Sequence, residues 1–212
     1  MHEDISMPRE KDLMRIAVSL CMYAVTFWAG QLVLYGMLRP AAGTMPLVIV
    51  MLAASSAGEE MLFHGYGFQR LLGLLGPYAA VFSVGALFAV MHGSNPNATW
   101  PGLVNTAGFG VLFGYALLRS RDLWLPIGLH FGWNCTLPLF GVNLSGLKMD
   151  LTGHEMVWTA GALWSGGEYG PEASMLTSGV LLLLFLYVAK APVGRQAPLL
   201  ADPSAEDRKS VV

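Results

Sequence analysis

The chain has 212 residues, of which 54% are hydrophobic and 12% are charged, and its formal net charge is −2. Soluble globular domains carry about 25% charged residues, so this composition favours a protein whose solvent is the lipid bilayer. The slight negative charge argues against a nucleic-acid-binding protein, which needs a basic face. We therefore expect membrane lipid as a partner and no nucleic acid.

Six apolar stretches follow one another along the chain, and none alternates with the period of two that is typical of barrel strands. Backbone polar groups in lipid must be satisfied within a helix or a closed barrel, so we expect helices. A straight span needs about 20 residues, and three of the stretches must borrow flanking residues to reach that length. The sequence predicts an all-α, polytopic membrane protein with about six transmembrane helices around an intramembrane site. The stretches are 16–38, 45–68, 78–91, 103–118, 123–140 and 175–189.

The two ends of the chain differ from this apolar region. The N-terminal segment, 1–15, runs directly into the first stretch without the cleavage site of a removable signal peptide. The end of the chain is rich in Pro, Ala and charged residues, as flexible tails are. We predict a cytoplasmic segment at 1–15, a membrane-embedded core at 16–190 and a flexible cytoplasmic tail at 191–212. Cys21 and Cys135 lie in apolar stretches and are interpreted as buried thiols.

Lys and Arg residues are distributed unequally between the two sides that six spans define. With the N-terminus inside, the outer side receives Arg39 and Lys148 alone. The positive-inside rule then predicts that both termini are cytoplasmic. The acidic and aromatic outer loop, 141–174, is expected to lie on the membrane surface. The inner side receives Arg9, Lys11, Arg15, Arg70, Arg119, Arg121, Lys190, Arg195, Arg208 and Lys209.

Glu59 and Glu60 are adjacent within an apolar stretch and are the only carboxylates between Asp12 and Asp122. An acidic residue at the centre of a membrane helix costs about 2.5–3.5 kcal/mol on insertion scales. Two neighbouring acids need a compensating use. The pair is therefore the first candidate for a functional site.

Three histidines, His64, His92 and His130, lie in or at the ends of apolar stretches. On a helix, Glu60 and His64 share a face, and so do His130 and Asn134. A carboxylate can take a proton from water, and histidines can bind a metal or position the water. An Asn side chain can stabilise the oxyanion of a tetrahedral intermediate. These side chains could together catalyse hydrolysis. They are too far apart in the sequence for their spacing to prove a metal site.

The depths of these residues raise a difficulty. At a rise of 1.5 Å per residue, His130 falls about 8–10 Å from the inner side and His92 about 20 Å. The two histidines meet if helices tilt, or if the third segment starts deeper in the membrane.

Three short motifs lie between residues 58 and 134. They are Glu-Glu-Met-Leu-Phe-His-Gly at 59–65, Phe88-x-x-x-His92 and His130-x-x-x-Asn134. In order and kind, these motifs resemble the CAAX protease and bacteriocin-processing (CPBP, or Abi) family. Members of this family are intramembrane endopeptidases, which hydrolyse a peptide bond of a protein or peptide in or near the membrane. Because the chain is short, it looks similar to prokaryotic members, which implies an integral protein of the prokaryotic inner membrane.

The resemblance implies a role for each matching residue. Glu59 is expected to be the water-activating base, and Glu60 the supporting carboxylate. His92 and His130 are expected to be metal ligands or water positioners, and Asn134 to assist at the oxyanion. The family is associated with a divalent metal, for which zinc is the first candidate, but a metal-free glutamate–histidine mechanism has also been argued. The expected metal ligands are His92, His130, Glu59 and, more weakly, His64.

One position departs from the family pattern, since the first motif usually ends in Arg-Gly and here ends in His64-Gly65. Arginine has a permanent charge and a two-pronged grip on carboxylates, whereas the charge of histidine depends on its surroundings. His64 is expected to pair with Glu60, to add a ligand or to mark a degenerate protein. The alternative functions are thus a non-catalytic membrane scaffold or immunity-type binding protein and a proton-coupled transporter. Transporters usually show duplicated halves, and the sequence shows none.

Overall fold

A computed structural model describes residues 45–149 and 151–194. Within these residues the fold is all-α, as predicted, and the sole β-type pairing is an isolated bridge between Leu144 and Leu147. The predicted span at 16–38 and the terminal segments 1–15 and 195–212 lie outside the described residues. The elements are α2 (Met45–His64), α3 (Tyr66–Leu75), α4 (Pro77–His92), α5 (Trp100–Ser120), α6 (Trp124–Leu139), α7 (Ala162–Ser165), the 3₁₀ turns η1 (Gly167–Tyr169) and η2 (Pro171–Ala173), and α8 (Met175–Lys190).

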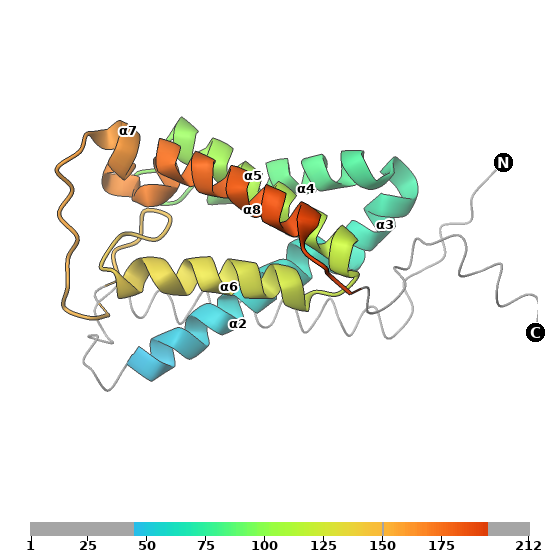
Figure 1. Cartoon of the computed structure of the whole chain (residues 1–212), viewed down its shortest axis with the longest axis horizontal. Helices are drawn as coiled ribbons and strands as arrows, with labels where there is room; N and C mark the ends of the chain where they lie inside the picture. Colours follow the sequence, from blue (N-terminus) through green and yellow to red (C-terminus); the bar gives the residue numbers. More distant parts are fainter. Residues whose placement is uncertain (1–44, 150, 195–212) are drawn as a thin grey trace, which may run out of the picture.

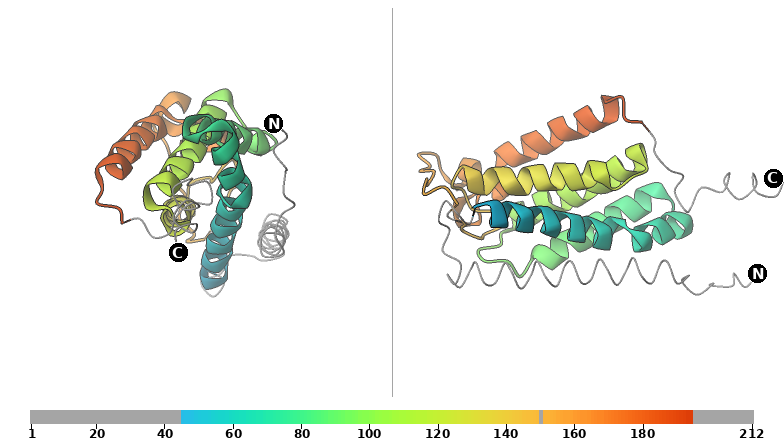
Figure 2. Two further views of the ribbon diagram at one scale, coloured as in Figure 1. Left: turned by 90° about the vertical axis from the view of Figure 1, so that its right-hand side faces the viewer. Right: turned by 90° about the horizontal axis from the view of Figure 1, so that it is seen from below.

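The long helices lie side by side in a bundle, with α5 packed against α4, α6 and α8 (Figures 1 and 2). Two helical stretches, Met45–Leu75 and Trp100–Ser120, are long and apolar enough to cross a membrane, and α4 and α8 are apolar but shorter. This supports a membrane protein, while the number of six spans stays a prediction. The core is centred on α5, whose buried apolar side chains are Phe109, Leu112, Phe113, Ala116 and Leu117.

Gly65 separates α2 from α3. A Cβ at this position would lie 2.1 Å from the Met61 carbonyl oxygen, so the backbone bends here in a way that a larger residue would obstruct. Glu59 and Glu60 consequently lie in the last turns of α2 rather than in the middle of a straight span. The third expected span is likewise preceded by α3, so the straight-span estimate of relative depth does not hold.

The close approach of α4 and α5 depends on glycines. A Cβ on Gly110 would lie 2.9 Å from the Gly85 Cα and 3.0 Å from the Phe88 Cβ. A Cβ on Gly114 would lie 3.4 Å from the ring of His64. The sequence Gly110-x-x-x-Gly114 is therefore a helix-packing face, as small residues at this spacing indicate in membrane proteins.

We expect Gly110→Ala to lower the unfolding midpoint in detergent, because forcing extra volume into a packed contact typically costs about 1–3 kcal/mol. The matched control is Gly179→Ala in α8, where an added Cβ meets nothing within 4 Å. The control should be unchanged or slightly more stable, since alanine favours helix over glycine. Equal midpoints for the two variants would contradict the close contact.

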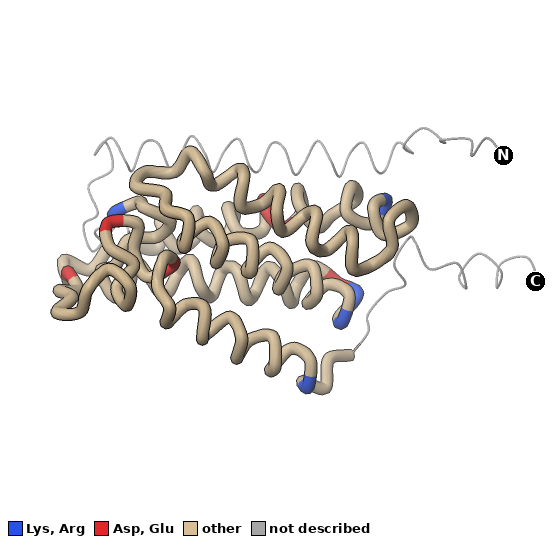
Figure 3. Tube along the Cα trace, turned by 90° about the horizontal axis from the view of Figure 1, so that it is seen from above, with Lys and Arg blue, Asp and Glu red and all other residues tan. Residues whose placement is uncertain are grey.

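Lys and Arg residues lie at the two ends of the bundle (Figure 3). Arg70, Arg119, Arg121 and Lys190 belong to α3, the end of α5 and the end of α8, which meet at one end. Lys148 lies at the other end, where it pairs with Glu155. The separation agrees with the distribution seen in the sequence. Which end faces the cytoplasm stays a prediction, as do the three predicted segments of the chain.

The loop at 141–174 differs from the prediction that it lies on the membrane surface. Val142, Leu144 and Leu151 are buried and pack in one cluster with Val48 and Leu52 of α2. These apolar side chains draw the first part of the loop onto the bundle, because burial removes them from a polar interface. Other parts stay outside, among them the exposed side chains of Trp158 and Trp164.

Candidate active site

Glu60 links two helices inside the bundle. Its carboxylate is fully buried, with Oε2 2.7 Å from Nδ1 of His64 and Oε1 2.8 Å from Nδ1 of His130. The bond to His64 follows from the helical spacing of four residues, as predicted. The bond to His130 joins α2 to α6. Glu60 therefore orients the imidazole of His130 and lies behind the cavity that is described below.

His64 has a partner for each ring nitrogen. Nδ1 contacts Glu60, and Nε2 lies 3.2 Å from the carbonyl oxygen of Gly110. Of the three roles expected for this residue, the geometry shows the pairing with Glu60. His64 therefore links Glu60 to the backbone of α5, from the position where the family motif has arginine.

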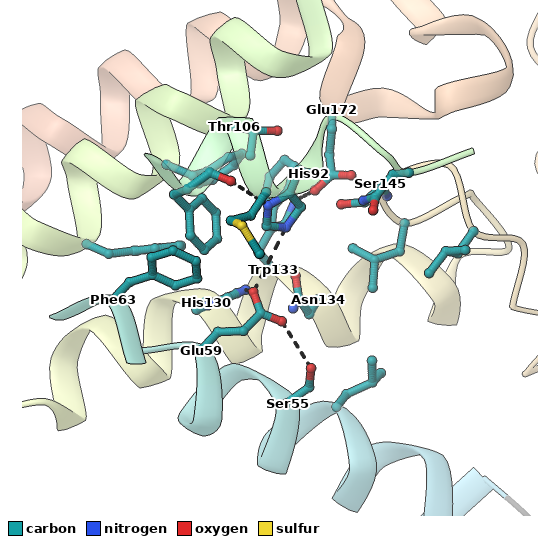
Figure 4. Close-up of a pocket in the computed structure, with 18 of the residues that line it drawn as sticks. Ser55, Glu59, Phe63, His92, Thr106, His130, Trp133, Asn134, Ser145 and Glu172 are labelled. Atoms are coloured by element: carbon teal, nitrogen blue, oxygen red, sulfur yellow. Dashed lines mark hydrogen bonds and ion pairs between the residues drawn. The ribbon is translucent and has the colours of Figure 1, made fainter. Parts of the chain in front are cut away.

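Glu59 points the other way, into the cavity (Figure 4). Its Oε1 accepts a hydrogen bond of 3.1 Å from the Ser55 hydroxyl. Its Oε2 is buried without a hydrogen-bond partner and lies 3.9 Å from Nε2 of His92 and 3.9 Å from Nε2 of His130. These separations are too long for direct hydrogen bonds and suit a water that bridges the groups. Three polar atoms from three helices thus face one small space.

The other ring nitrogens of these histidines are fixed. Nδ1 of His92 donates to the Phe88 carbonyl oxygen at 2.8 Å, and Nδ1 of His130 donates to Glu60. In a neutral imidazole the second nitrogen is then an acceptor. Both Nε2 atoms therefore present lone pairs toward Glu59. The two histidines meet despite the difference in depth expected for straight spans, because the Nε2 atom of each lies 3.9 Å from Oε2 of Glu59.

Asn134 lies one turn after His130 on α6 and lines the same cavity. Its Nδ2 donates to the hydroxyl of Ser56 at 3.3 Å, which leaves the second hydrogen of that amide for another acceptor. The structure thus brings together five predicted residues. They are Glu59, Glu60, His92, His130 and Asn134.

The cavity has a volume of about 280 Å³ and a mostly apolar wall. None of the described residues that line it is Lys or Arg. Ligand sites are typically concave and apolar with a few convergent polar groups, and this cavity has that character. Its apolar lining includes Met51, Leu52, Phe63, Phe88, Phe109, Phe113, Leu144, Leu147 and Met149.

Three further residues of the site are absent from the sequence predictions. Ser55 precedes Glu59 by one helical turn, a spacing that is a usable signal. Trp133 is partly buried in the cavity wall, and its Nε1 donates to Glu172 at 3.0 Å. Glu172 was expected on the membrane surface and is instead buried. By contrast, Trp100 and Trp124 are exposed, as interfacial residues are.

The surroundings of Glu172 shift its proton affinity. Burial raises the pKa of this carboxyl group above its usual value, against the lowering effect of hydrogen bonds from Ser145 and Trp133. Glu172 and His92 both line the cavity.

The predicted metal ligands are only partly assembled. Within 45–149 and 151–194, no three His, Cys, Asp and Glu side chains are placed to hold a metal ion. Nε2 of His92 and Nε2 of His130 each lie 3.9 Å from Oε2 of Glu59, and both nitrogens of His64 are engaged elsewhere. The metal stays a prediction, and we derive no step through it.

Fold and site together describe a helical membrane protein with a buried, hydrolase-like cluster of carboxylates and histidines. The family model for the Rce1-like type II CAAX prenyl endopeptidases matches residues 41–136. The matched part contains all the predicted site residues, and over it the chain is similar to that family of membrane proteases. The resemblance seen in the motifs is thereby confirmed. Comparisons with curated proteins and with solved structures gave no match.

Proposed function

We propose that the protein is an intramembrane endopeptidase in which Glu59 activates a water held against His92 and His130. The observation that carries this proposal is the buried Oε2 of Glu59, which lacks a partner and faces both Nε2 atoms. A buried carboxylate oxygen without a partner is uncommon and indicates a missing hydrogen-bonding group. The match to a family of proteases suggests that this group is the water that attacks the peptide bond.

The proposed reaction begins when Glu59 takes a proton from the water as its oxygen attacks the carbonyl carbon of the peptide bond. The oxyanion that forms accepts the remaining hydrogen of Asn134 Nδ2. The carbon–nitrogen bond then breaks, and Glu59 returns the proton to the leaving amine. The second O–H of the water donates to Nε2 of either His92 or His130, which orients the attacking oxygen, while Glu60 fixes the tautomer of His130.

The metal that the sequence predicts stays a separate proposal. A divalent ion held by His92, His130 and Glu59 would lower the pKa of its bound water and polarise the carbonyl group. Glu59 would then be a ligand as well as a base. Elemental analysis of the purified protein distinguishes the two forms of the proposal: stoichiometric zinc that is lost in His92→Ala supports the metal, and its absence supports the bridging water.

An apolar peptide segment is the substrate that the cavity favours. Its wall is formed largely by aliphatic, aromatic and methionine side chains, and none of its described lining residues is Lys or Arg. A segment that lies in or next to the membrane would meet this wall without losing strong hydration. We therefore propose a membrane-associated protein or peptide as the partner of this site.

The test is incubation of the protein in detergent with a panel of apolar membrane peptides, followed by mass spectrometry of the products. We expect cleavage at defined bonds, and a loss of about 10²-fold or more in His92→Ala. His154→Ala is the matched control, because His154 is exposed and does not line the cavity. Intact peptides with a folded wild-type protein would instead favour a non-catalytic binding protein.

A further inference from the structure

A second polar network holds Glu172 at the wall of the cavity. Asn105 of α5 donates through Nδ2 to the backbone oxygens of Glu172, at 2.7 Å, and Ser174, at 3.0 Å. The Ser178 hydroxyl of α8 donates to Asn105 Oδ1 at 2.8 Å. Asn105 is thus fixed from both sides, and it fixes η2 between α5 and α8. These hydrogen bonds fix the backbone of Glu172 independently of the contacts that its side chain makes.

The carboxylate of Glu172 then joins two further parts of the cavity wall. Oε1 accepts from the indole N–H of Trp133 on α6, and Oε2 accepts from the backbone N–H of Ser145. The residue is 6% exposed and lines the cavity. In Figure 4 it lies on the opposite side of His92 from Glu59. Glu172 therefore ties the helix that carries His130 and Asn134 to the loop that covers the cavity.

The loop held by Glu172 is a tight turn from Leu144 to Leu147. Ser145 and Gly146 have φ values of 48° and 81°, and the isolated bridge closes the turn. The N–H of Gly146 donates to the Tyr169 carbonyl oxygen at 2.8 Å. Leu144, Ser145 and Leu147 all line the cavity. Movement of this turn would change the shape of the wall without touching Glu59.

Burial of a carboxylate in the cavity wall costs free energy. Removal of a charge from water is unfavourable unless it is paired, and an apolar residue of similar size often packs as well or better. Among the described residues that line the cavity, no Lys or Arg pairs with Glu172. Its two N–H donors come instead from Trp133 and Ser145. The placement therefore favours a role in the site over a role in stability alone.

We propose that Glu172 is a positioning residue for substrate binding. Its hydrogen bonds hold Trp133 and the turn at Ser145 in place, and these form part of the cavity wall. The proposal rests on the endopeptidase function proposed above. Glu172 lies outside residues 41–136, so the family match does not include it.

The test compares steady-state kinetics of Glu172→Gln with those of Glu168→Gln, an exposed glutamate of the same loop. An amide can accept only one of the two N–H bonds as well as the carboxylate does. We expect KM to rise about tenfold in Glu172→Gln, as for the loss of one hydrogen bond, with kcat within about threefold of wild type. KM should be unchanged in Glu168→Gln.

Trp133→Phe gives an independent route to the same result. It removes the indole N–H but keeps an aromatic ring against Phe109, whose ring centroid lies 4.7 Å from that of Trp133. KM should again rise. In the double variant with Glu172→Gln, the increase in KM should be smaller than the product of the two single increases. The indole N–H resonance that Trp133→Phe removes should shift in Glu172→Gln, which checks the contact without activity.

The outcomes separate the two proposals. Wild-type KM in both Glu172→Gln and Trp133→Phe, with cleavage intact, overturns the positioning role and leaves the endopeptidase function standing. An equal effect in Glu168→Gln also overturns it. A folded wild-type protein that cleaves no peptide overturns both. If Glu172→Gln fails to fold, the KM of Trp133→Phe decides.

Discussion

Replacement of Glu59 by glutamine is expected to lower kcat for peptide cleavage by about 10²–10⁴-fold, the range that a positioned general base supplies. Glutamine has nearly the same shape but cannot take a proton from water. The unfolding midpoint should stay close to that of wild type, because Oε2 of Glu59 has no hydrogen-bond partner and glutamine keeps an acceptor for the Ser55 hydroxyl. The measurement is single-peptide kinetics with thermal unfolding of the same detergent sample.

Ser55→Ala is the graded control for this prediction. It leaves the base in place and removes the hydrogen bond that orients Glu59. We expect a loss of about tenfold, as for one hydrogen bond. If Ser55→Ala and Glu59→Gln lose activity equally, or if Glu59→Gln retains wild-type kcat, the assignment of Glu59 as the base is wrong.

The second large effect concerns stability and falls on His64. His64→Leu would leave the fully buried Glu60 with His130 as its remaining partner. Removal of one member of a buried ion pair typically destabilises a protein by about 3–5 kcal/mol, because the other charge is left unpaired. We expect a loss of this size in the free energy of unfolding, measured by denaturant titration in detergent.

A double variant separates pairing from packing. In Glu60→Leu/His64→Leu the buried charges disappear together, so much of the lost stability should return. Activity should not return, since Nδ1 of His130 has lost the carboxylate that fixes its orientation. A single His64→Leu variant as stable as wild type would contradict the paired state of Glu60. Active double variants would contradict the supporting role of this carboxylate.

Much of the site could be predicted from the sequence, because several of its contacts join residues that are close together in the chain. Glu60 and His64 are one helical turn apart and are hydrogen-bonded, as are His92 and the carbonyl oxygen of Phe88. Two acids in an apolar stretch mark a functional position at any depth. The order of the motifs then indicated that His130 would join them, and the structure brings it to both acids.

Other parts of the site depend on contacts between residues that are far apart in the chain. The hydrogen bond between Trp133 and Glu172 joins residues 39 positions apart, and nothing in the sequence around either residue points to the other. A tryptophan near a helix end reads as interfacial, and a glutamate in an acidic loop reads as exposed. The bend at Gly65 similarly depends on a close approach to the Met61 carbonyl oxygen, which hydropathy does not report. Straight spans therefore gave wrong relative depths.

The most direct test of the account is cleavage of one apolar membrane peptide in ¹⁸O-labelled water, with wild type and Glu59→Gln purified side by side. The proposed water attack predicts that wild type produces a fragment whose new carboxyl group carries one ¹⁸O atom, and that Glu59→Gln leaves the peptide intact. The same labelled fragment from both proteins at equal rates, or intact peptide with a folded wild type, would contradict it.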